Sequence, residues 1–188
     1  MSPKRVLIVN GSPRKRGNSV LLAAQVAAGA REAGADVETV TLQDLDIQPC
    51  TACEACKGTD EGDCIIQDGM QSLYPKVRAA DAIVIATPVY WFTMSAQAKL
   101  FIDRFYALID TARGNLLTGK KFAFVLAYGD SDPFTSGAIN AIRAFQDMCR
   151  YLQAEIVGFV YGTASEQGEI QSQEDLLEEA RRLGRKLG

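Results

Sequence analysis

Short apolar runs rich in β-branched residues alternate with longer stretches of helical periodicity along this chain. Nearly continuous apolar runs of this length are typical of parallel strands in a sheet that is covered on both faces. We therefore predict five strands, at Val6–Val9, Val37–Leu42, Ala82–Thr87, Phe122–Ala127 and Ile156–Tyr161.

Apolar residues at helical spacing fall between the strands and after the last one. We expect the first helix to begin at Asn18 or Ser19, either of which can cap it, and to end near Gly34. Cys149 lies on such a stripe and is expected to be a small buried hydrophobe. The other apolar stripes are Met70–Val77, Ala98–Ile109, Ile139–Leu152 and Leu176–Leu187, the last preceded by a possible capping box at Ser172–Asp175.

Five strand–helix units predict an α/β fold, a flavodoxin-like, three-layer, doubly wound sheet of five parallel strands in the order 2-1-3-4-5. We expect residues 1–188 to form a single domain, with a cysteine-rich insertion at about 43–69. Such sheets bind ligands at the carboxyl ends of their strands, near the reversal of strand order between strands 1 and 3. The loops that leave strands 1, 3 and 4 are therefore the candidate site.

Composition narrows the chemistry. A net charge of −3 gives no reason to expect nucleic acid or an anionic membrane as partner, and no apolar run is long enough for a membrane helix. The apolar start is too short for a signal peptide, so we expect a cytoplasmic protein.

The chain has no histidine, which excludes histidine-based acid–base catalysis and histidine-activated nucleophiles. A carboxylate, a tyrosine, a thiolate or a bound cofactor must do any chemistry.

The loop after the first strand, Gly11–Ser19, reads GSPRKRGNS and opens onto a helix N-terminus. Its hydroxyl groups, three cations and exposed backbone N–H groups are typical of an anion site. It matches neither the Walker loop nor the dinucleotide glycine motif. The alternative is a surface turn with a solvated basic cluster.

A proline and three consecutive aromatic residues follow the third strand, and a tyrosine and a glycine follow the fourth. Aromatic residues there can flank a flat ligand, or they can pack on the next helix or in a subunit interface. A phosphate site beside an aromatic wall indicates a ligand with one phosphate and one flat ring system, and FMN fits. An enzyme without histidine could take its chemistry from such a flavin.

Four of the five cysteines, Cys50, Cys53, Cys56 and Cys64, lie within fifteen residues of the long segment 43–69. The segment shows no clear period and is longer than the usual connection, which indicates a functional role. It leaves the carboxyl end of the second strand, so we expect it to emerge at the same sheet edge as the flavin. Its close cysteine spacing favours a [4Fe–4S] cluster. Zinc and free thiols remain alternatives, whereas disulfides suit neither a reducing compartment nor the spacing.

Two motifs, Gly11–Ser19 and Thr87–Arg104 (TPVYWFTMSAQAKLFIDR), resemble the phosphate loop and the flavin-ring loop of the NADPH-dependent FMN reductase family. The cysteine run resembles that of its iron–sulfur flavoprotein subgroup, except that Ala52 stands where many relatives have glycine. The resemblance implies a site built from the phosphate loop, a wall along the flavin ring, a border on its other side and a cluster. The phosphate loop would contribute Ser12, Arg14, Gly17, Asn18 and Ser19, and the wall along the flavin ring Pro88, Val89, Tyr90, Trp91 and Phe92. The other border would consist of Tyr128, Gly129 and Asp130, and the cluster would be bound by Cys50, Cys53, Cys56 and Cys64.

The expected function is an FMN-dependent NAD(P)H oxidoreductase that passes electrons to a quinone or another acceptor, through the cluster if one is bound. The alternative is a non-enzymatic electron carrier that works between redox proteins such as ferredoxin. The resemblance also implies a homodimer or homotetramer, with the aromatic run 90–92 and the cysteine segment at the subunit interface.

Overall fold

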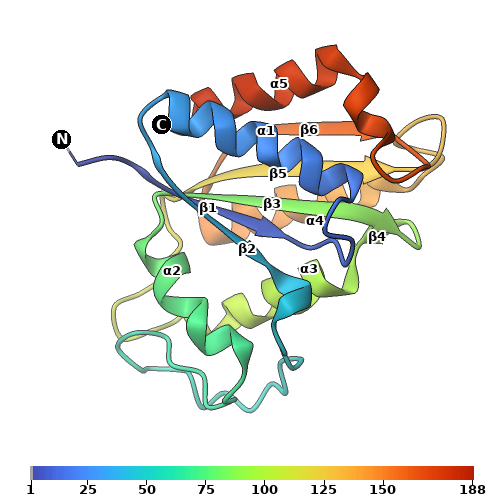
Figure 1. Cartoon of the computed structure of the whole chain (residues 1–188). Coiled ribbons are helices and arrows are strands. Elements are labelled where there is room, and N and C mark those ends of the chain that lie inside the picture. Colours follow the sequence, from blue (N-terminus) through green and yellow to red (C-terminus); the bar gives the residue numbers. More distant parts are fainter. Residues whose placement is uncertain (1) are drawn as a thin grey trace.

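A computed structural model describes residues 2–188, and a parallel sheet with helices on both faces forms its centre (Figure 1). The strands are β1 (Arg5–Asn10), β2 (Asp36–Thr41), β3 (Ala82–Tyr90), β4 (Thr93–Met94), β5 (Lys121–Tyr128) and β6 (Glu155–Thr163). The α-helices are α1 (Asn18–Glu32), α2 (Tyr74–Ala79), α3 (Ala96–Asp103), α4 (Ala138–Leu152) and α5 (Glu174–Arg185). Four 3₁₀ turns are η1 (Leu42–Asp44), η2 (Gly69–Ser72), η3 (Arg104–Leu108) and η4 (Glu169–Ser172).

The strand order is β2-β1-β3-β5-β6, and all of these pairs are parallel. The predicted doubly wound fold is therefore confirmed, with β5 and β6 as the predicted fourth and fifth strands. One element was not predicted: β4 pairs with the end of β3 as an antiparallel hairpin. Because β3 continues to Tyr90, the predicted end of this strand at Thr87 is wrong by three residues.

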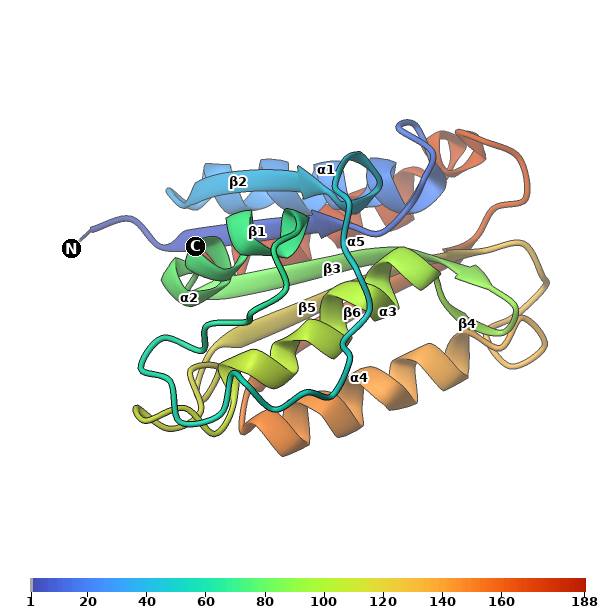
Figure 2. The same ribbon diagram turned by 90° about the horizontal axis from the view of Figure 1, so that it is seen from below.

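Helices α1 and α5 cover one face of the sheet, and α2, α3 and α4 cover the other (Figures 1 and 2). The β-branched and aromatic side chains of the three central strands fill both interfaces. On the α4 side, for example, the rings of Phe124 and Phe145 stack with centroids 4.2 Å apart. Cys149 is buried in the same layer, as predicted. Nowhere in residues 2–188 is there a helix with the length and apolar character needed to cross a membrane.

The predicted helix caps are partly wrong. Helix α1 is preceded by Gly17 in extended conformation and has no side-chain cap, so neither Asn18 nor Ser19 caps it. Helix α5 likewise begins without a side-chain cap, because the hydroxyl of Ser172 instead donates to the carbonyl of Glu169 at 2.9 Å. Both helices are held in place by the sheet beneath them, where burial outweighs the roughly 1 kcal/mol that a cap contributes.

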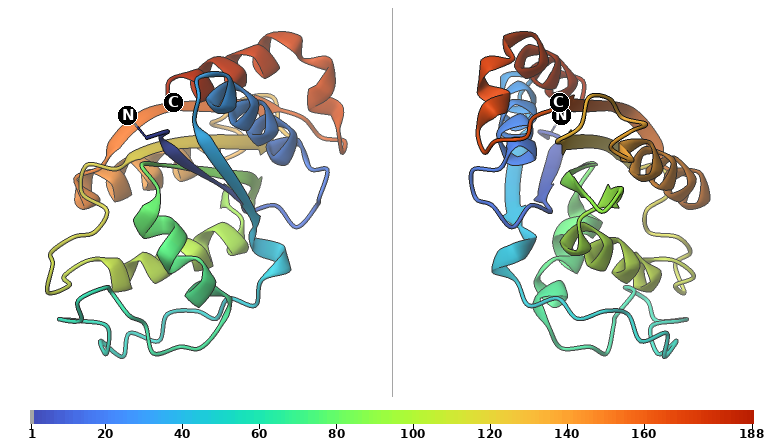
Figure 3. Two further views of the ribbon diagram at one scale, coloured as in Figure 1. Left: turned by 60° about the vertical axis from the view of Figure 1, so that its left-hand side comes forward. Right: turned by 90° about the vertical axis from the view of Figure 1, so that its right-hand side faces the viewer.

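The cysteine segment forms no strand or α-helix between η1 and η2, in agreement with its irregular sequence. It leaves the carboxyl end of β2 and then runs back beneath α3 and η3 to reach α2 (Figures 2 and 3). Gly62, which has a φ of +73°, lies so close to η3 that a Cβ there would be 2.3 Å from the carbonyl oxygen of Ala107. The segment is therefore packed against the helix layer.

Candidate functional site

A cavity of about 180 Å³ opens where β1, β3, β5 and β6 reach their carboxyl ends. This is the place where the crevice rule locates ligands in doubly wound sheets. Its walls include every predicted cofactor residue except Trp91, Phe92 and Asp130. The lining residues are Ser12, Arg14, Gly17, Asn18, Ser19, Pro88, Val89, Tyr90, Ala127, Tyr128, Gly129, Ala164, Ser165 and Gln167.

The loop between β1 and α1 leaves polar groups free toward this cavity. The hydroxyl of Ser19 is buried and has no hydrogen-bond partner among the described residues. A Cβ at Gly17 would lie 2.7 Å from the hydroxyl oxygen of Ser12, so glycine lets the loop close tightly around that side chain. Within residues 2–188, Arg14, Lys15 and Arg16 form no ion pair. An uncompensated guanidinium on the cavity wall, that of Arg14, and a free buried hydroxyl at a helix N-terminus fit a phosphate group.

Asn18 has a different contact from the one expected of a phosphate ligand. Its amide nitrogen donates to the carbonyl oxygens of Ala164 at 3.3 Å and Glu166 at 2.8 Å, and its amide oxygen accepts from the Gly168 N–H at 2.9 Å. The side chain thus joins the phosphate loop to the loop after β6. Asn18 still lines the cavity, but its polar atoms position a wall.

A fourth wall of the cavity, which follows β6 and consists of Ala164, Ser165 and Gln167, was not predicted from the sequence. The prediction was limited to the loops after strands 1, 3 and 4, although the last strand of a parallel sheet ends at the same edge. The small residues Ala164 and Ser165, directly after that apolar run, were the available signal. The Ser165 hydroxyl donates to the carbonyl of Gly129 at 3.0 Å, which joins two walls of the cavity.

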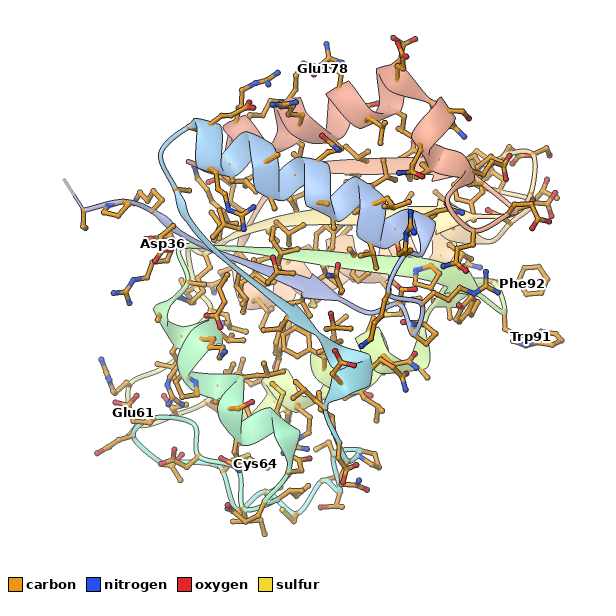
Figure 4. All side chains as sticks on the ribbon, in the orientation of Figure 1. Asp36, Glu61, Cys64, Trp91, Phe92 and Glu178 are labelled. Atoms are coloured by element: carbon orange, nitrogen blue, oxygen red, sulfur yellow. The ribbon has the colours of Figure 1, made fainter. Side chains whose placement is uncertain are left out.

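The aromatic residues form a hairpin with two distinct surfaces. Tyr90, at the end of β3, lines the cavity, whereas Trp91 and Phe92 form the hairpin tip and point outward (Figure 4). Their side chains are 91% and 57% exposed. Both have positive φ, 46° and 65°, although two-residue hairpin turns of this kind favour asparagine and glycine. The tip therefore retains backbone strain that neighbouring contacts must hold.

The third predicted wall is only partly in place. Tyr128 is buried and lines the cavity beside Gly129, and burial raises the pKa of the Tyr128 hydroxyl, which stays protonated. Asp130 lies outside the lining: its carboxylate accepts from the Ser131 N–H and its carbonyl accepts from the Thr163 hydroxyl at 2.8 Å. Asp130 thus closes the end of the wall through its backbone.

The four predicted metal ligands share a second, separate hollow. Cys50, Cys53, Cys56 and Cys64 all line it, together with residues of α2 and η3, and it has no lining residue in common with the cavity at the carboxyl edge of the sheet. The segment leaves the sheet at the predicted edge, the carboxyl end of β2, but its cysteines line a hollow against α2 and η3 and none of them lines the cavity at the end of β1, β3, β5 and β6. The segment turns away because its contacts are with η3, at the far end of α3.

Thiols as the donor set fit a thiolate-bound metal group, since soft sulfur ligands are typical of iron–sulfur and zinc sites. The hollow, however, measures about 10 Å³, roughly the space of one water molecule. No three ligand-type side chains in residues 2–188 converge as a metal ion requires. Cys50 and Cys53 are exposed, so the ligand chemistry is present without a formed site.

Comparison with known proteins agrees with this geometry. Residues 4–169 match the NADPH-dependent FMN reductase family. The chain belongs to that family. It is 37% identical over 150 residues to an iron–sulfur flavoprotein of Methanosarcina thermophila, covering 80% of this chain and 75% of that one. An iron–sulfur flavoprotein of Archaeoglobus fulgidus is 31% identical over 180 residues, 94% of this chain and 76% of its own.

Solved structures share the fold. An NAD(P)H:quinone oxidoreductase from Methanothermobacter marburgensis superimposes with a TM-score of 0.73 over the whole of both chains, at 17% identity. Family membership makes this FMN reductase family protein an oxidoreductase that uses FMN and NAD(P)H. The prediction of an enzyme is thereby confirmed.

Proposed function

We propose that the FMN reductase family protein binds FMN in the cavity at the carboxyl edge of the sheet and transfers electrons from NAD(P)H to a quinone. The observation that carries this proposal is the cavity itself, which combines an anion-binding loop with an apolar wall at the carboxyl edge of the sheet. The phosphate would lie against Ser12, Arg14 and Ser19, where hydroxyl groups and a guanidinium meet the N-terminus of α1.

The flat ring would lie between two walls that the chain builds from different strands. Pro88, Val89 and Tyr90 form one wall, and Tyr128 and Gly129 form the other. Bound FMN supplies the hydride acceptor that the chain's own residues lack. The chain has no histidine for proton transfer. Its residues would therefore act by orienting the ring and excluding water from it.

The reaction balances without any further reagent. NAD(P)H gives up a hydride and becomes NAD(P)⁺, and the quinone takes two electrons and two protons to become the hydroquinone, one proton coming from solvent. The exposed Trp91 and Phe92 stand beside the mouth of the cavity, next to Tyr90, and would contact an aromatic acceptor or the nicotinamide before it enters.

The flavin proposal is tested with apoprotein titrated with FMN and, separately, with riboflavin. If the phosphate loop binds the phosphate, FMN binds much more tightly than riboflavin, and Arg14→Gln weakens FMN binding about tenfold or more, as expected for loss of a charge-assisted contact. Lys15→Gln is the matched control, because Lys15 is a neighbouring exposed cation that does not line the cavity. Equal affinities for FMN and riboflavin would rule out this phosphate site.

Turnover separates the enzyme from the electron carrier. FMN-loaded protein is mixed with NADH or NADPH and a soluble quinone, and nicotinamide oxidation is followed at 340 nm. Loss of absorbance that depends on the quinone supports the proposed reaction. Reduction of the flavin by a reduced ferredoxin but never by a nicotinamide would support the carrier instead.

We further propose that the four cysteines bind a [4Fe–4S] cluster. The all-thiol donor set supports this, and the relatives from M. thermophila and A. fulgidus are named iron–sulfur flavoproteins. The cysteine segment would have to open around its hollow of about 10 Å³ to admit the cluster. Protein purified without oxygen should contain about four irons and four acid-labile sulfides per chain. Iron-free protein with bound zinc or with four free thiols would exclude the cluster and leave the flavin proposal intact.

A further inference from the structure

The largest fully buried side chain of the described residues is a charged one, Arg104, at the start of η3. It forms an ion pair with Asp68, and the two side chains are 1% and 2% exposed. The guanidinium also donates to the carbonyl oxygen of Gln48 at 2.8 Å. Arg104 thus joins the end of α3 to two points of the cysteine segment that are twenty residues apart.

The same guanidinium reaches a cysteine. Nη2 of Arg104 lies 3.3 Å from Sγ of Cys64, and both residues line the cysteine hollow. Arg104 stays positively charged: burial disfavours the charged form, but the hydrogen bond to Asp68 raises the pKa of the guanidinium. Burial also raises the pKa of Tyr74, whose protonated hydroxyl donates to the Arg104 carbonyl at 3.4 Å.

One nitrogen of the guanidinium serves both the carboxylate and the sulfur: Nη2 donates to Oδ1 of Asp68 at 3.3 Å and lies equally close to Sγ of Cys64. A residue that only fastened the segment would be satisfied by Asp68 and Gln48. Here Nη2 of the guanidinium also contacts Sγ of Cys64, while the Nε–H of Arg104 remains buried without a hydrogen-bond partner among the described residues. Leaving a buried donor unpaired costs about 1–3 kcal/mol, so the plane of the group is set by its carboxylate and sulfur contacts.

We propose that Arg104 is a positioning residue for a thiolate-bound metal group in the cysteine hollow. Its planar guanidinium, paired with Asp68, directs Cys64 toward the hollow, and its charge offsets the negative charge that metal-bound thiolates bring there. The inference rests on the proposed metal-binding role of the cysteines and is independent of the flavin site.

The test uses Co²⁺ as probe, because a cobalt–thiolate complex shows a charge-transfer absorption band and requires no cluster assembly. Reduced full-length protein is titrated without oxygen as wild type, Arg104→Met and Arg104→Lys. Substitution of groups that orient metal ligands typically lowers metal affinity about 10- to 100-fold, and this is the loss expected for Arg104→Met. Arg104→Lys keeps the charge beside Asp68 but has no fork to reach Cys64 as well, so it should also bind more weakly.

Arg113→Gln is the matched control. Arg113 pairs with Glu61 of the same segment at 2.7 Å, but both side chains are exposed and neither lines the hollow. It should bind Co²⁺ like the wild type. Circular dichroism of each variant verifies the fold, and if Arg104→Met does not fold, Arg104→Lys decides.

The outcomes are distinct. Wild-type affinity in a folded Arg104→Lys or Arg104→Met variant overturns the positioning role and leaves metal binding by the cysteines standing. A wild-type protein that binds neither Co²⁺ nor iron overturns both the positioning role and the proposed cluster. If Arg113→Gln lowers the Co²⁺ affinity as much as the Arg104 variants do, the positioning role of Arg104 is also overturned. Any contact of the cysteine segment would then have the same effect.

Discussion

The hydroxyl of Ser95 donates to the carbonyl oxygen of Gly11 at 2.6 Å, across 84 residues of sequence. It therefore fastens the loop before α3 to the phosphate loop. The same hydroxyl accepts from the Ala98 N–H and caps α3, and the Ser95 N–H donates to the Thr87 hydroxyl at 2.9 Å. Both cofactor-binding loops thus depend on one buried serine.

Ser95→Ala should therefore weaken both stability and flavin binding. Loss of the cap costs about 1 kcal/mol, and an unpaired Gly11 carbonyl adds about as much again. We expect the free energy of unfolding to fall by about 2 to 3 kcal/mol in urea titrations, with faster release of FMN. Ser172→Ala is the control, since its exposed hydroxyl also bonds a carbonyl, and it should change stability by less than about 0.5 kcal/mol. An equal effect of the two substitutions would contradict this role of Ser95.

Gly137→Ala should move the aromatic hairpin. Gly137 has a φ of +76°, and a Cβ there would lie 2.5 Å from Cβ of Phe92, where the Asn140 side chain also donates to the Phe92 carbonyl at 3.0 Å. We expect the free energy of unfolding to fall by more than about 2 kcal/mol, because a steric clash adds to the backbone penalty of alanine at positive φ. Trp91 is the only tryptophan, so its emission should change as the tip shifts.

Gly34→Ala provides the control for that experiment. Gly34 has a comparable φ of +88°, but no atom lies within 4 Å of its added Cβ. In the Gly34→Ala variant the free energy of unfolding should fall only by the backbone penalty, about 1–2 kcal/mol, and the emission of Trp91 should stay unchanged. If both glycine variants lose the same stability and leave the emission unaltered, Gly137 does not support the hairpin.

The sheet and most of the cavity could be predicted from sequence because they follow from local patterns. Apolar runs give the strands, handed crossovers give their order, and the crevice rule then selects the loops, so that Ser12 and Tyr90 are found on one cavity. The direction of the aromatic side chains could not be predicted, since it depends on the unforeseen pairing of β4 with β3.

The position of the cysteines could not be predicted either. It depends on the pairing of Arg104 with Asp68, 36 residues apart, and no sequence period reports such a contact. An arginine inside an apolar helical stripe was the one available signal, because charged residues are rarely buried without a partner. The single-domain organisation, the cytoplasmic location and the oligomeric state remain predictions.

Asp132 should keep its charge in strongly acidic solution. The Thr135 N–H and hydroxyl, together with the Phe134 N–H, donate to its carboxylate and lower its pKa to about 2. A carboxylate whose folded pKa lies below its unfolded value stabilises the fold above about pH 4, and this contribution disappears as the pH falls toward 2. The carboxyl ¹³C shift of Asp132 should show a midpoint near 2, and Thr135→Val should raise it. A midpoint near 4 in the wild type would contradict this loop geometry.

Ala52→Gly should stabilise the cysteine segment. Ala52 has a φ of +53°, in the left-handed region that costs a residue with a Cβ about 1–2 kcal/mol. Glycine relieves this strain but adds about 0.4–1 kcal/mol of entropy to the unfolded chain, so we expect a net gain of up to about 1 kcal/mol. Urea unfolding of metal-free protein measures this gain. Ala55→Gly is the control, because Ala55 is exposed in the same segment without positive φ, and it should lose stability. Destabilisation by both substitutions would show that the loop before Cys53 does not hold this conformation in solution.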